Sequence, residues 1–213
     1  LLLDQDSLPA TDLVEQLYVA LRSKQQSGLK VAAVGPYYYD VKGQLRSPFV
    51  RLEGLHLKRV DCGEQEVVQV DHLISSGSLI PLSVLSDVAG MEDGLFIDYV
   101  DTEWCLRAKA KGYQLFGVGA AKMQHDLGDQ MVSFMGRQLP VHSPLRYYYL
   151  VRNGVWLMRQ PCVSWQWRLM DIRRLSLVYM VYSLFIGNRF ENFKMMTLGL
   201  CHGLLGKMGK LDV

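Results

Sequence analysis

The sequence lacks the features that mark several common classes of protein. It has 23 Lys and Arg against 21 Asp and Glu, a net charge of only +2, whereas a nucleic-acid-binding domain is normally strongly basic. The longest apolar run, from Leu175 to Ile186, covers about a dozen residues, short of the about 20 needed to cross a bilayer. Its first residues lack the basic segment of a signal peptide. We therefore expect no nucleic-acid partner and no membrane-spanning helix.

The cysteines form no Cys-x-x-Cys pair. Cys62, Cys105, Cys162 and Cys201 stand far apart, which matches neither a zinc site nor a redox motif. We expect reduced, buried thiols in a cytoplasmic protein.

With 213 residues, 49% of them hydrophobic, the chain is long enough for one globular domain, or for a domain with an appendage. It begins without Met, and residues 1–3, all Leu, have the pattern of a buried strand already under way. Because a fold rarely begins with a central strand, we expect that an N-terminal part of the protein is absent from this chain.

Strand and helix patterns alternate along most of the chain. Strands are expected over residues 1–3, 31–34, 67–74 and 113–118, and helices over 11–28, 81–88 and 96–111. Thr11 is the expected N-cap of the first helix, and residues 37–64 are expected to be a long loop. A helix opens at 143–144, and the chain beyond 165 is helical with a break at 187–188. This order predicts an α/β domain over 1–140, followed by a helical region over 141–213.

Asp4 and Asp6 are two carboxylates, one residue apart, directly after the expected first strand. Ligands of open α/β sheets bind at the carboxyl ends of strands. Two carboxylates there suit a hard divalent cation, Mg²⁺ or Mn²⁺, that also binds phosphate oxygens. Since Asp is also common in ordinary turns, the pair alone favours a metal site and a simple turn about equally.

A second acidic group lies at the start of the helix expected over 96–111. The positive end of a helix dipole attracts carboxylates whatever their function, so the group has a purely structural explanation. Glu103 stands four residues before Arg107, which predicts a solvated salt bridge. Asp98 and Asp101 are three residues apart and are expected to share one helix face, where one of them suits a general base.

His125 lies in the stretch MQHDLGD over residues 123–129. It suits the completion of a metal shell or contact with a phosphate, although a single His near a turn is more often a packing or capping residue. The other histidines have no metal-ligand spacing and are expected to be structural.

Together these stretches resemble glycosyltransferase family 2, and more narrowly the bacterial rhamnosyltransferases that build O-antigen and other surface polysaccharides. The motifs that carry the resemblance are LLLDQDS, SSGSLI over 75–80, LFIDYVDTEWCLRAKAKGYQL, HDLGD, and SPLRYYYLVRN over 143–153. It runs over essentially the whole chain. FIDYVDTEWCLR and YYYLVRN are specific in combination, whereas the Asp-x-Asp motif alone is not.

The resemblance implies a GT-A fold, a Rossmann-like α/β domain that here lacks its N-terminal nucleobase-binding strands. It implies inverting transfer of a sugar, rhamnose from dTDP-rhamnose, to a saccharide or lipid-linked acceptor. By motif position, Asp4 and Asp6 would bind the metal and the donor diphosphate, with His125 assisting. Ser76, Gly77 and Ser78 would form the small-residue turn beneath donor sugar and acceptor.

The resemblance also bears on the general base. The family usually has a Glu-Asp pair ahead of an L-x-R, and here that pair aligns with Val100-Asp101. The missing Glu leaves Asp101 and Asp98 as alternatives, with Asp101 favoured by its position.

Two other functions are compatible with the sequence. An apolar strand followed by Asp-x-Asp also opens Mg²⁺-dependent, haloacid-dehalogenase-like phosphatases, although Ser7-Leu8-Pro9 departs from their pattern. The second alternative is a non-catalytic module for assembly or membrane binding.

The sequence of the C-terminal helices is compatible with membrane binding, with packing inside the protein and with a homodimer interface. Basic residues flank the apolar run at Arg173-Arg174, Arg189 and Lys194, which favours peripheral binding at the inner face of the cell membrane. Ordinary helix packing and a homodimer interface are the alternatives. Arg152-Asn153 suits either helix packing or the lining of an acceptor site.

Overall fold

The computed structural model describes residues 1–39, 46–125, 130–134 and 136–212. The chain forms two compact units, which are described separately below. The first contains Leu1–Met91 and Asp101–Leu127, and the second contains Glu92–Val100 and Gly128–Val213. The division that the sequence predicts after residue 140 stays a prediction.

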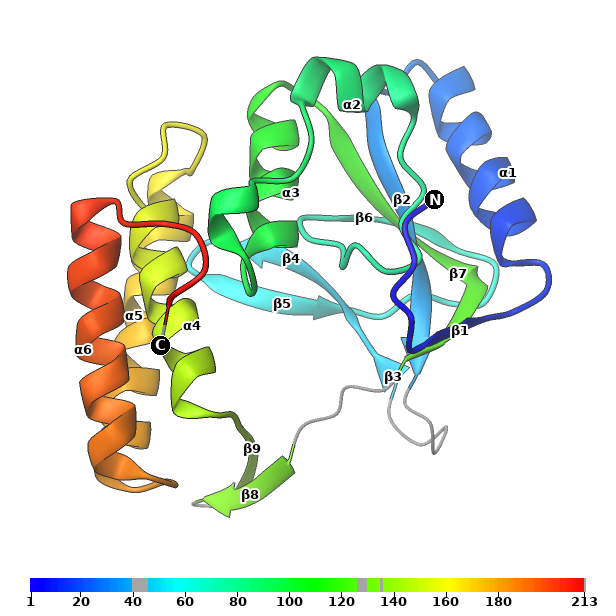
Figure 1. Cartoon of the computed structure of the whole chain (residues 1–213). Helices are drawn as coiled ribbons and strands as arrows, with labels where there is room; N and C mark the ends of the chain where they lie inside the picture. Colours follow the sequence, from blue (N-terminus) through cyan, green and yellow to red (C-terminus); the bar gives the residue numbers. More distant parts are fainter. Residues whose placement is uncertain (40–45, 126–129, 135, 213) are drawn as a thin grey trace. The chain divides into compact units, whose positions relative to one another are not determined.

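A mixed five-stranded sheet forms the centre of the first unit (Figure 1). Its strands are β1 (Ser7–Pro9), β2 (Val31–Tyr39), β3 (Arg46–Ser47), β6 (Val67–Val70) and β7 (Gln114–His125). β7 pairs with β2 in parallel along one edge. Along its other edge, β7 pairs antiparallel with β6 and then with β1. The long strand β7 therefore brings β1, which follows the Asp-x-Asp motif, into the sheet.

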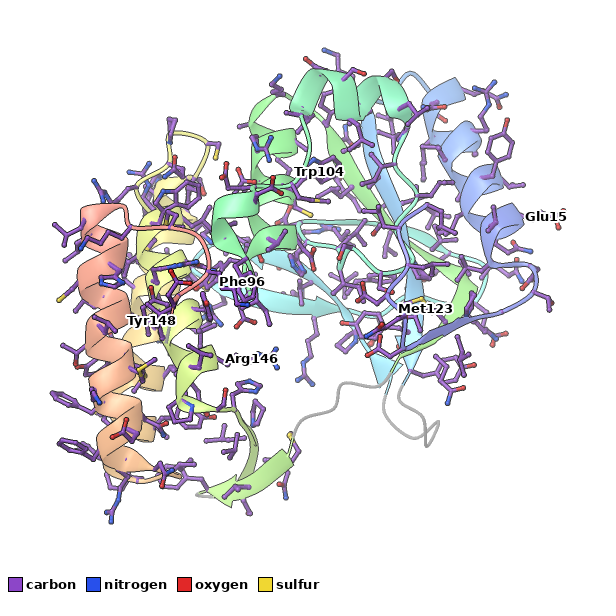
Figure 2. All side chains as sticks on the ribbon, viewed as in Figure 1. Glu15, Phe96, Trp104, Met123, Arg146 and Tyr148 are labelled. Carbon is purple, nitrogen blue, oxygen red and sulfur yellow. The ribbon has the colours of Figure 1, made fainter. Side chains whose placement is uncertain are left out.

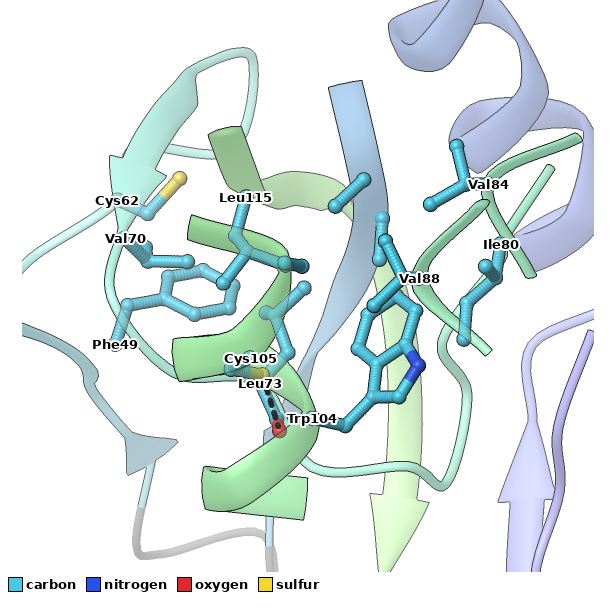
Figure 3. Close-up of a cluster of buried hydrophobic side chains, with 13 residues drawn as sticks. Phe49, Cys62, Val70, Leu73, Ile80, Val84, Val88, Trp104, Cys105 and Leu115 are labelled. Carbon is cyan, nitrogen blue, oxygen red and sulfur yellow. Dashed lines mark hydrogen bonds between the residues drawn. The ribbon is translucent and has the colours of Figure 1, made fainter. Parts of the chain in front are cut away.

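Helices cover both faces of this sheet. Leu13 and Leu17 of α1 (Leu13–Gln26) pack on Val34 and Phe116 on one face. On the other face, residues of α2 (Leu82–Val88) and α3 (Val100–Ala110) form a second apolar cluster with sheet residues (Figure 3). In that cluster, Trp104 donates its indole N–H to the carbonyl of Ala89 at 2.9 Å. The first unit thus confirms the expected α/β architecture.

The loop expected over 37–64 contains regular structure, so that expectation is wrong. β2 extends to Tyr39, and β4 (Phe49–Glu53) pairs with β5 (His56–Val60) as a hairpin. Glu53 faces His56 across a two-residue turn, and Gly54 supplies the left-handed φ of +61° in it. All but the last residue of β5 are exposed, so the hairpin has no apolar run or clear alternation to reveal it.

Three helices form most of the second unit: α4 (Pro144–Leu157), α5 (Trp165–Leu184) and α6 (Arg189–Leu205). Ser143 caps α4 by accepting a hydrogen bond from the Arg146 N–H, with Pro at the start of the helix as expected. Two glycines of α6 allow close packing on α4. A Cβ on Gly199 would lie 2.4 Å from the Tyr148 carbonyl oxygen, and one on Gly203 would lie 2.6 Å from that of Arg152. Figure 2 shows Tyr148 and Arg146 on α4.

The second unit also contains shorter elements. The hairpin of β8 (Gln130–Phe134) and β9 (Arg137–Val141) precedes α4, and the 3₁₀ helix η1 (Asp93–Leu95) lies in the segment before α3.

Among the residues that the structure describes, no helix is both long and apolar enough to span a membrane.

Several local expectations need correction. Residues Leu1, Leu2 and Leu3 are exposed by 46, 38 and 46% and form no regular strand, because within the described part of the chain only Leu2 of the three has backbone hydrogen-bond partners. Asp12, rather than Thr11, occupies the N-cap position of α1, and its side chain makes no capping hydrogen bond.

Candidate active site

The Asp-x-Asp motif and the small-residue turn come together in the first unit. The Asp4 N–H donates to Ser76 Oγ at 3.1 Å, and the hydroxyls of Ser7 and Ser76 are 2.7 Å apart. Leu2 reinforces the contact through its backbone, since its N–H donates to the Ser78 carbonyl and its carbonyl accepts from Gly77. Two segments about 70 residues apart in sequence are therefore joined by side-chain and backbone hydrogen bonds.

Gly77 is the residue that allows this turn to lie so close to the sheet. Its φ of +78° is in the left-handed region, which side chains rarely adopt. A Cβ at this position would lie 2.5 Å from Pro36 Cγ and 2.9 Å from Met123 Sδ. Ser78 closes the turn by donating its hydroxyl to the Ile74 carbonyl at 2.5 Å.

The carboxylates of Asp4 and Asp6 are the hard oxygen donors that Mg²⁺ or Mn²⁺ prefers, and both residues are exposed. Cations of this kind are commonly held by one or two carboxylates and by substrate phosphates, so these residues fit the expected metal. In the described part of the chain, no three His, Cys, Asp or Glu side chains form a closed metal cluster. The β1–β7 register places the backbone of His125 opposite Ser7, next to Asp6 in sequence. The His125 side chain and residues 126–129 of its motif lie outside the description.

Asp101 lies in the first turn of α3 and is half-buried. Its neighbours in a small pocket include Ser75 and Ser78, from the same turn that contacts the Asp-x-Asp motif. Among the described residues, no Lys, Arg or His forms an ion pair with the Asp101 carboxylate. The structure thus places a carboxylate without a cationic partner beside the predicted donor turn.

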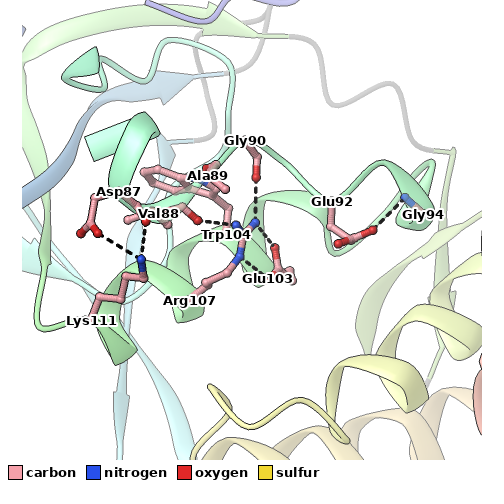
Figure 4. Close-up of polar contacts among 10 residues, drawn as sticks. All are labelled: Asp87, Val88, Ala89, Gly90, Glu92, Gly94, Glu103, Trp104, Arg107 and Lys111. Atoms are coloured by element: carbon pink, nitrogen blue, oxygen red, sulfur yellow. Dashed lines mark hydrogen bonds and ion pairs between the residues drawn. The ribbon is translucent and has the colours of Figure 1, made fainter. Parts of the chain in front are cut away.

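The expected salt bridge between Glu103 and Arg107 is confirmed, but Glu103 is buried rather than solvated. Its two carboxylate oxygens accept from Arg107 Nε and Nη2, each at 2.8 Å (Figure 4). The same guanidinium donates to the carbonyls of Val88, at 2.5 Å, and Gly90, at 2.8 Å, after α2. The pair therefore ties α3 to the end of α2.

Asp98 does not share a helix face with Asp101, and that expectation is also wrong. α3 begins only at Val100, and Asp98 precedes it with a left-handed φ of +60°. Asp98 also belongs to the second unit. Its carboxylate, 17% exposed, pairs with Arg146 of α4 at 3.4 Å. The physical reason is that backbone in this conformation cannot continue a right-handed helix.

Asp71 has a structural role that the sequence did not indicate, and the burial of Arg152 and Asn153 favours one of the two roles expected for them. Asp71 is buried, accepts from the Leu52 N–H at 2.7 Å and pairs with Lys109 of α3. The stretch 67–74 showed only strand alternation, which gives no sign of this contact. Arg152 and Asn153 are 1% and 0% exposed, so they belong to the interior of the second unit rather than to an open acceptor surface.

One comparison with known proteins shows the family of this chain. No protein-family model matches the chain. The dTDP-rhamnosyl transferase RfbF of Shigella flexneri is 32% identical over 211 residues, covering 97% of this chain and 69% of that protein. Among solved structures, GalNAc-T7 with UDP, GalNAc and Mn²⁺ aligns with a TM-score of 0.45 at 13% identity. That alignment covers 82% of this chain and 37% of GalNAc-T7, and it is too weak to support an argument.

Proposed function

The chain belongs to the glycosyltransferase family that includes the dTDP-rhamnosyl transferase RfbF of Shigella flexneri, and from this membership we propose its reaction in detail. It acts as an inverting GT-A glycosyltransferase that moves rhamnose from dTDP-rhamnose. The acceptor is a hydroxyl of a saccharide or of a lipid-linked glycan in cell-surface polysaccharide synthesis.

The proximity of Asp101 to Ser75 and Ser78, which line the same small pocket, is the observation that carries this proposal. An inverting transfer needs a carboxylate on the acceptor side and a donor site within reach of it. Asp101 meets the first requirement because no basic side chain among the described residues forms an ion pair with it. Glu103 and Asp98, in contrast, pair with Arg107 and Arg146. The turn at Ser76 supports the second, since it is hydrogen-bonded to the Asp-x-Asp motif.

In the proposed reaction, the acceptor oxygen attacks the anomeric carbon while the bond to the nucleoside diphosphate breaks. Asp101 takes the acceptor hydroxyl proton at its carboxylate, and the leaving diphosphate carries away the bonding electrons. Asp4 and Asp6 would hold a divalent cation, whose charge stabilises the leaving diphosphate. The buried turn of Ser76, Gly77 and Ser78 lies beneath the donor sugar and holds the Asp-x-Asp segment in place, and His125 assists at the diphosphate.

A screen of nucleotide release from dTDP-, UDP- and GDP-sugars tests the proposal. We expect release of dTDP from dTDP-rhamnose in the presence of Mg²⁺ or Mn²⁺ and a saccharide acceptor. Hydrolysis of a simple aryl phosphate without sugar transfer would favour the phosphatase alternative. Absence of both activities and of nucleotide-sugar binding in the intact protein would favour a non-catalytic module.

The proposal extends to a membrane surface that presents a lipid-linked acceptor. Many large apolar side chains of α5 and α6 are exposed: Leu169, Ile172, Leu177, Met180, Leu184, Phe190, Phe193, Leu200, Leu204 and Leu205. The second unit has eleven Lys and Arg against seven Asp and Glu. Exposed apolar helix faces with a basic excess favour shallow binding to anionic lipids.

A further inference from the structure

The segment immediately before α3 has an unusual backbone. Phe96, Asp98 and Tyr99 have φ values of +62°, +60° and +65°, and none of them is Gly. Side chains with a Cβ rarely adopt this region, and several such residues together persist only where their surroundings hold them. The contacts that hold this segment are therefore informative about its role.

Asn153 of α4 is the central contact. Its fully buried amide nitrogen Nδ2 lies within hydrogen-bond distance of the carbonyls of Leu95 at 2.9 Å, Ile97 at 2.7 Å and Asp98 at 2.9 Å, so one of its two hydrogens is shared between two of these oxygens. The left-handed turns bring these three carbonyl oxygens to one point. One side chain thus binds three of the segment's carbonyl oxygens, which would otherwise lose hydrogen bonds inside the protein.

Arg152 determines which end of that amide faces the segment. Its Nε donates to Asn153 Oδ1 at 2.8 Å, so Nδ2 is left to face the carbonyls. Its Nη2 donates to the carbonyls of Gly94 at 3.1 Å and Leu95 at 2.9 Å. Because a guanidinium only donates, it can bind the oxygen end of the amide but not the nitrogen end.

A second anchor holds the end of the segment. The Tyr99 hydroxyl donates to Asp171 Oδ2 at 2.7 Å, and Arg174 donates to the other oxygen of Asp171 at 2.9 Å. Gly154, next to Asn153, leaves room for this tyrosine, since a Cβ there would lie 2.6 Å from Tyr99 Oη. The segment is thus fixed at both ends by side chains of α4 and α5.

We propose that Asn153, oriented by Arg152, is a positioning residue for the general base. The proposal rests on the proposed function. Val100 follows Tyr99 directly and opens α3, and Asp101 is the second residue of that helix. The path that Asn153 imposes on residues 95–98 therefore sets where α3 begins, and with it the backbone that leads directly into Asp101.

A double-mutant cycle in the intact protein separates positioning from general stability. We expect Asn153→Ser to lower kcat by about 10²-fold, because a small misplacement of a reacting group has effects of that size. The Kd for dTDP-rhamnose should stay within about twofold, since the donor site is built from other residues. In an Asp101→Asn background, the same substitution should change the residual rate by less than about twofold, because its effect passes through Asp101.

Asn192 provides a matched control. It is another buried Asn of the second unit, and its amide donates to the carbonyls of Tyr182 and Ile186, both at 3.2 Å. Asn192→Ser should lower the midpoint of thermal unfolding. At a temperature where the protein is folded, it should leave kcat unchanged. An equal loss of kcat from Asn153→Ser and Asn192→Ser, or an equal loss from Asn153→Ser in both Asp101 backgrounds, would contradict the proposal.

If Asn153→Ser does not fold, Tyr99→Phe provides a second test of the positioning role. This substitution removes only the hydroxyl that binds Asp171 in the second anchor. It should lower kcat by about tenfold in the parent protein and leave the Asp101→Asn rate unchanged. Unaltered kcat in Tyr99→Phe would overturn the positioning role. A parent protein without transfer activity would instead refute the proposed function, and circular dichroism would show whether the fold is intact.

Discussion

Three acids within six residues have different surroundings, which gives each of them a different chemistry. Arg107 binds both oxygens of Glu103, and Arg146 pairs with Asp98. Asp101 lines a pocket with two serines of the predicted donor turn. Spacing along the chain predicted the Glu103 pairing, but the Asp98 partner lies 48 residues away and no local pattern indicates it.

We expect the transfer activity to require a divalent cation that Asp6 and Asp4 bind. Asp6→Asn removes one anionic ligand, so turnover should fall by orders of magnitude while the far-ultraviolet spectrum stays unchanged. EDTA should abolish activity, and added Mn²⁺ or Mg²⁺ should restore it. Asp12→Asn, an exposed acid before α1, is the control. Full activity in EDTA would rule out the metal assignment.

The cysteines should differ in reactivity, because only the thiolate is nucleophilic. Burial raises the pKa of Cys105 to about 12, and burial together with the Glu66 charge raises the pKa of Cys62. Cys201 is exposed and Cys162 is half-buried, which corrects the expectation that all four thiols are buried. At pH 8, iodoacetamide should label Cys201 first, and Cys62 and Cys105 only after denaturation. Peptide mass spectrometry measures this order, and rapid labelling of Cys105 would contradict the described packing.

At the scale of elements, the contact between α3 and the end of α2 depends on Glu103. Glu103→Ala leaves a partly buried guanidinium without its carboxylate, and we expect a loss of about 3 kcal/mol in the free energy of unfolding. The exposed pair Lys58–Glu53 is the matched control, and Glu53→Ala should cost less than about 1 kcal/mol. Urea unfolding of both variants measures the difference. Equal, small losses would show that the buried pair adds no stability.

Elements with a clear apolar period were predictable from sequence. The leucines at 13, 17 and 21 indicated α1, and Ser143-Pro144 indicated the start of α4. The β4–β5 hairpin was not predictable, because its second strand is exposed along most of its length. The turn over 96–99 was hidden because Phe, Asp and Tyr occupy backbone conformations that usually indicate Gly. Asn153 and Asp171, which hold that turn, come from later helices.

Part of the arrangement of the candidate site was predictable, whereas the roles of its residues stay predictions. The motifs named Asp4, Asp6, Ser76 and Asp101, and the structure joins the first and third by a hydrogen bond. The sequence did not indicate the hydrogen bonds between Leu2 and residues 77 and 78. These residues are far apart along the chain, and the bonds join backbone groups, which every residue has.

At the scale of the whole molecule, the exposed apolar faces of α5 and α6 should bind membranes. Sedimentation with phosphatidylglycerol vesicles should recover more protein than sedimentation with phosphatidylcholine vesicles. Phe190→Ser with Phe193→Ser should reduce binding, because these side chains are 75% and 48% exposed. Val14→Ser with Val19→Ser on α1 is the control, with similarly exposed side chains. A change in oligomeric state without any vesicle binding would favour the homodimer interface instead.

We propose that this glycosyltransferase uses Asp101 as its general base. Replacing Asp by Asn keeps the shape of the side chain but removes its basicity, which typically lowers the rate by about 10²–10⁴-fold. The most direct measurement compares kcat for dTDP-rhamnose in Asp101→Asn and Asp98→Asn of the intact protein, with the donor Kd measured for each. We predict a loss of that size in Asp101→Asn, with donor binding retained, and a smaller loss in Asp98→Asn. Near-normal turnover in Asp101→Asn together with loss of turnover in Asp98→Asn would contradict the account and assign the base to Asp98.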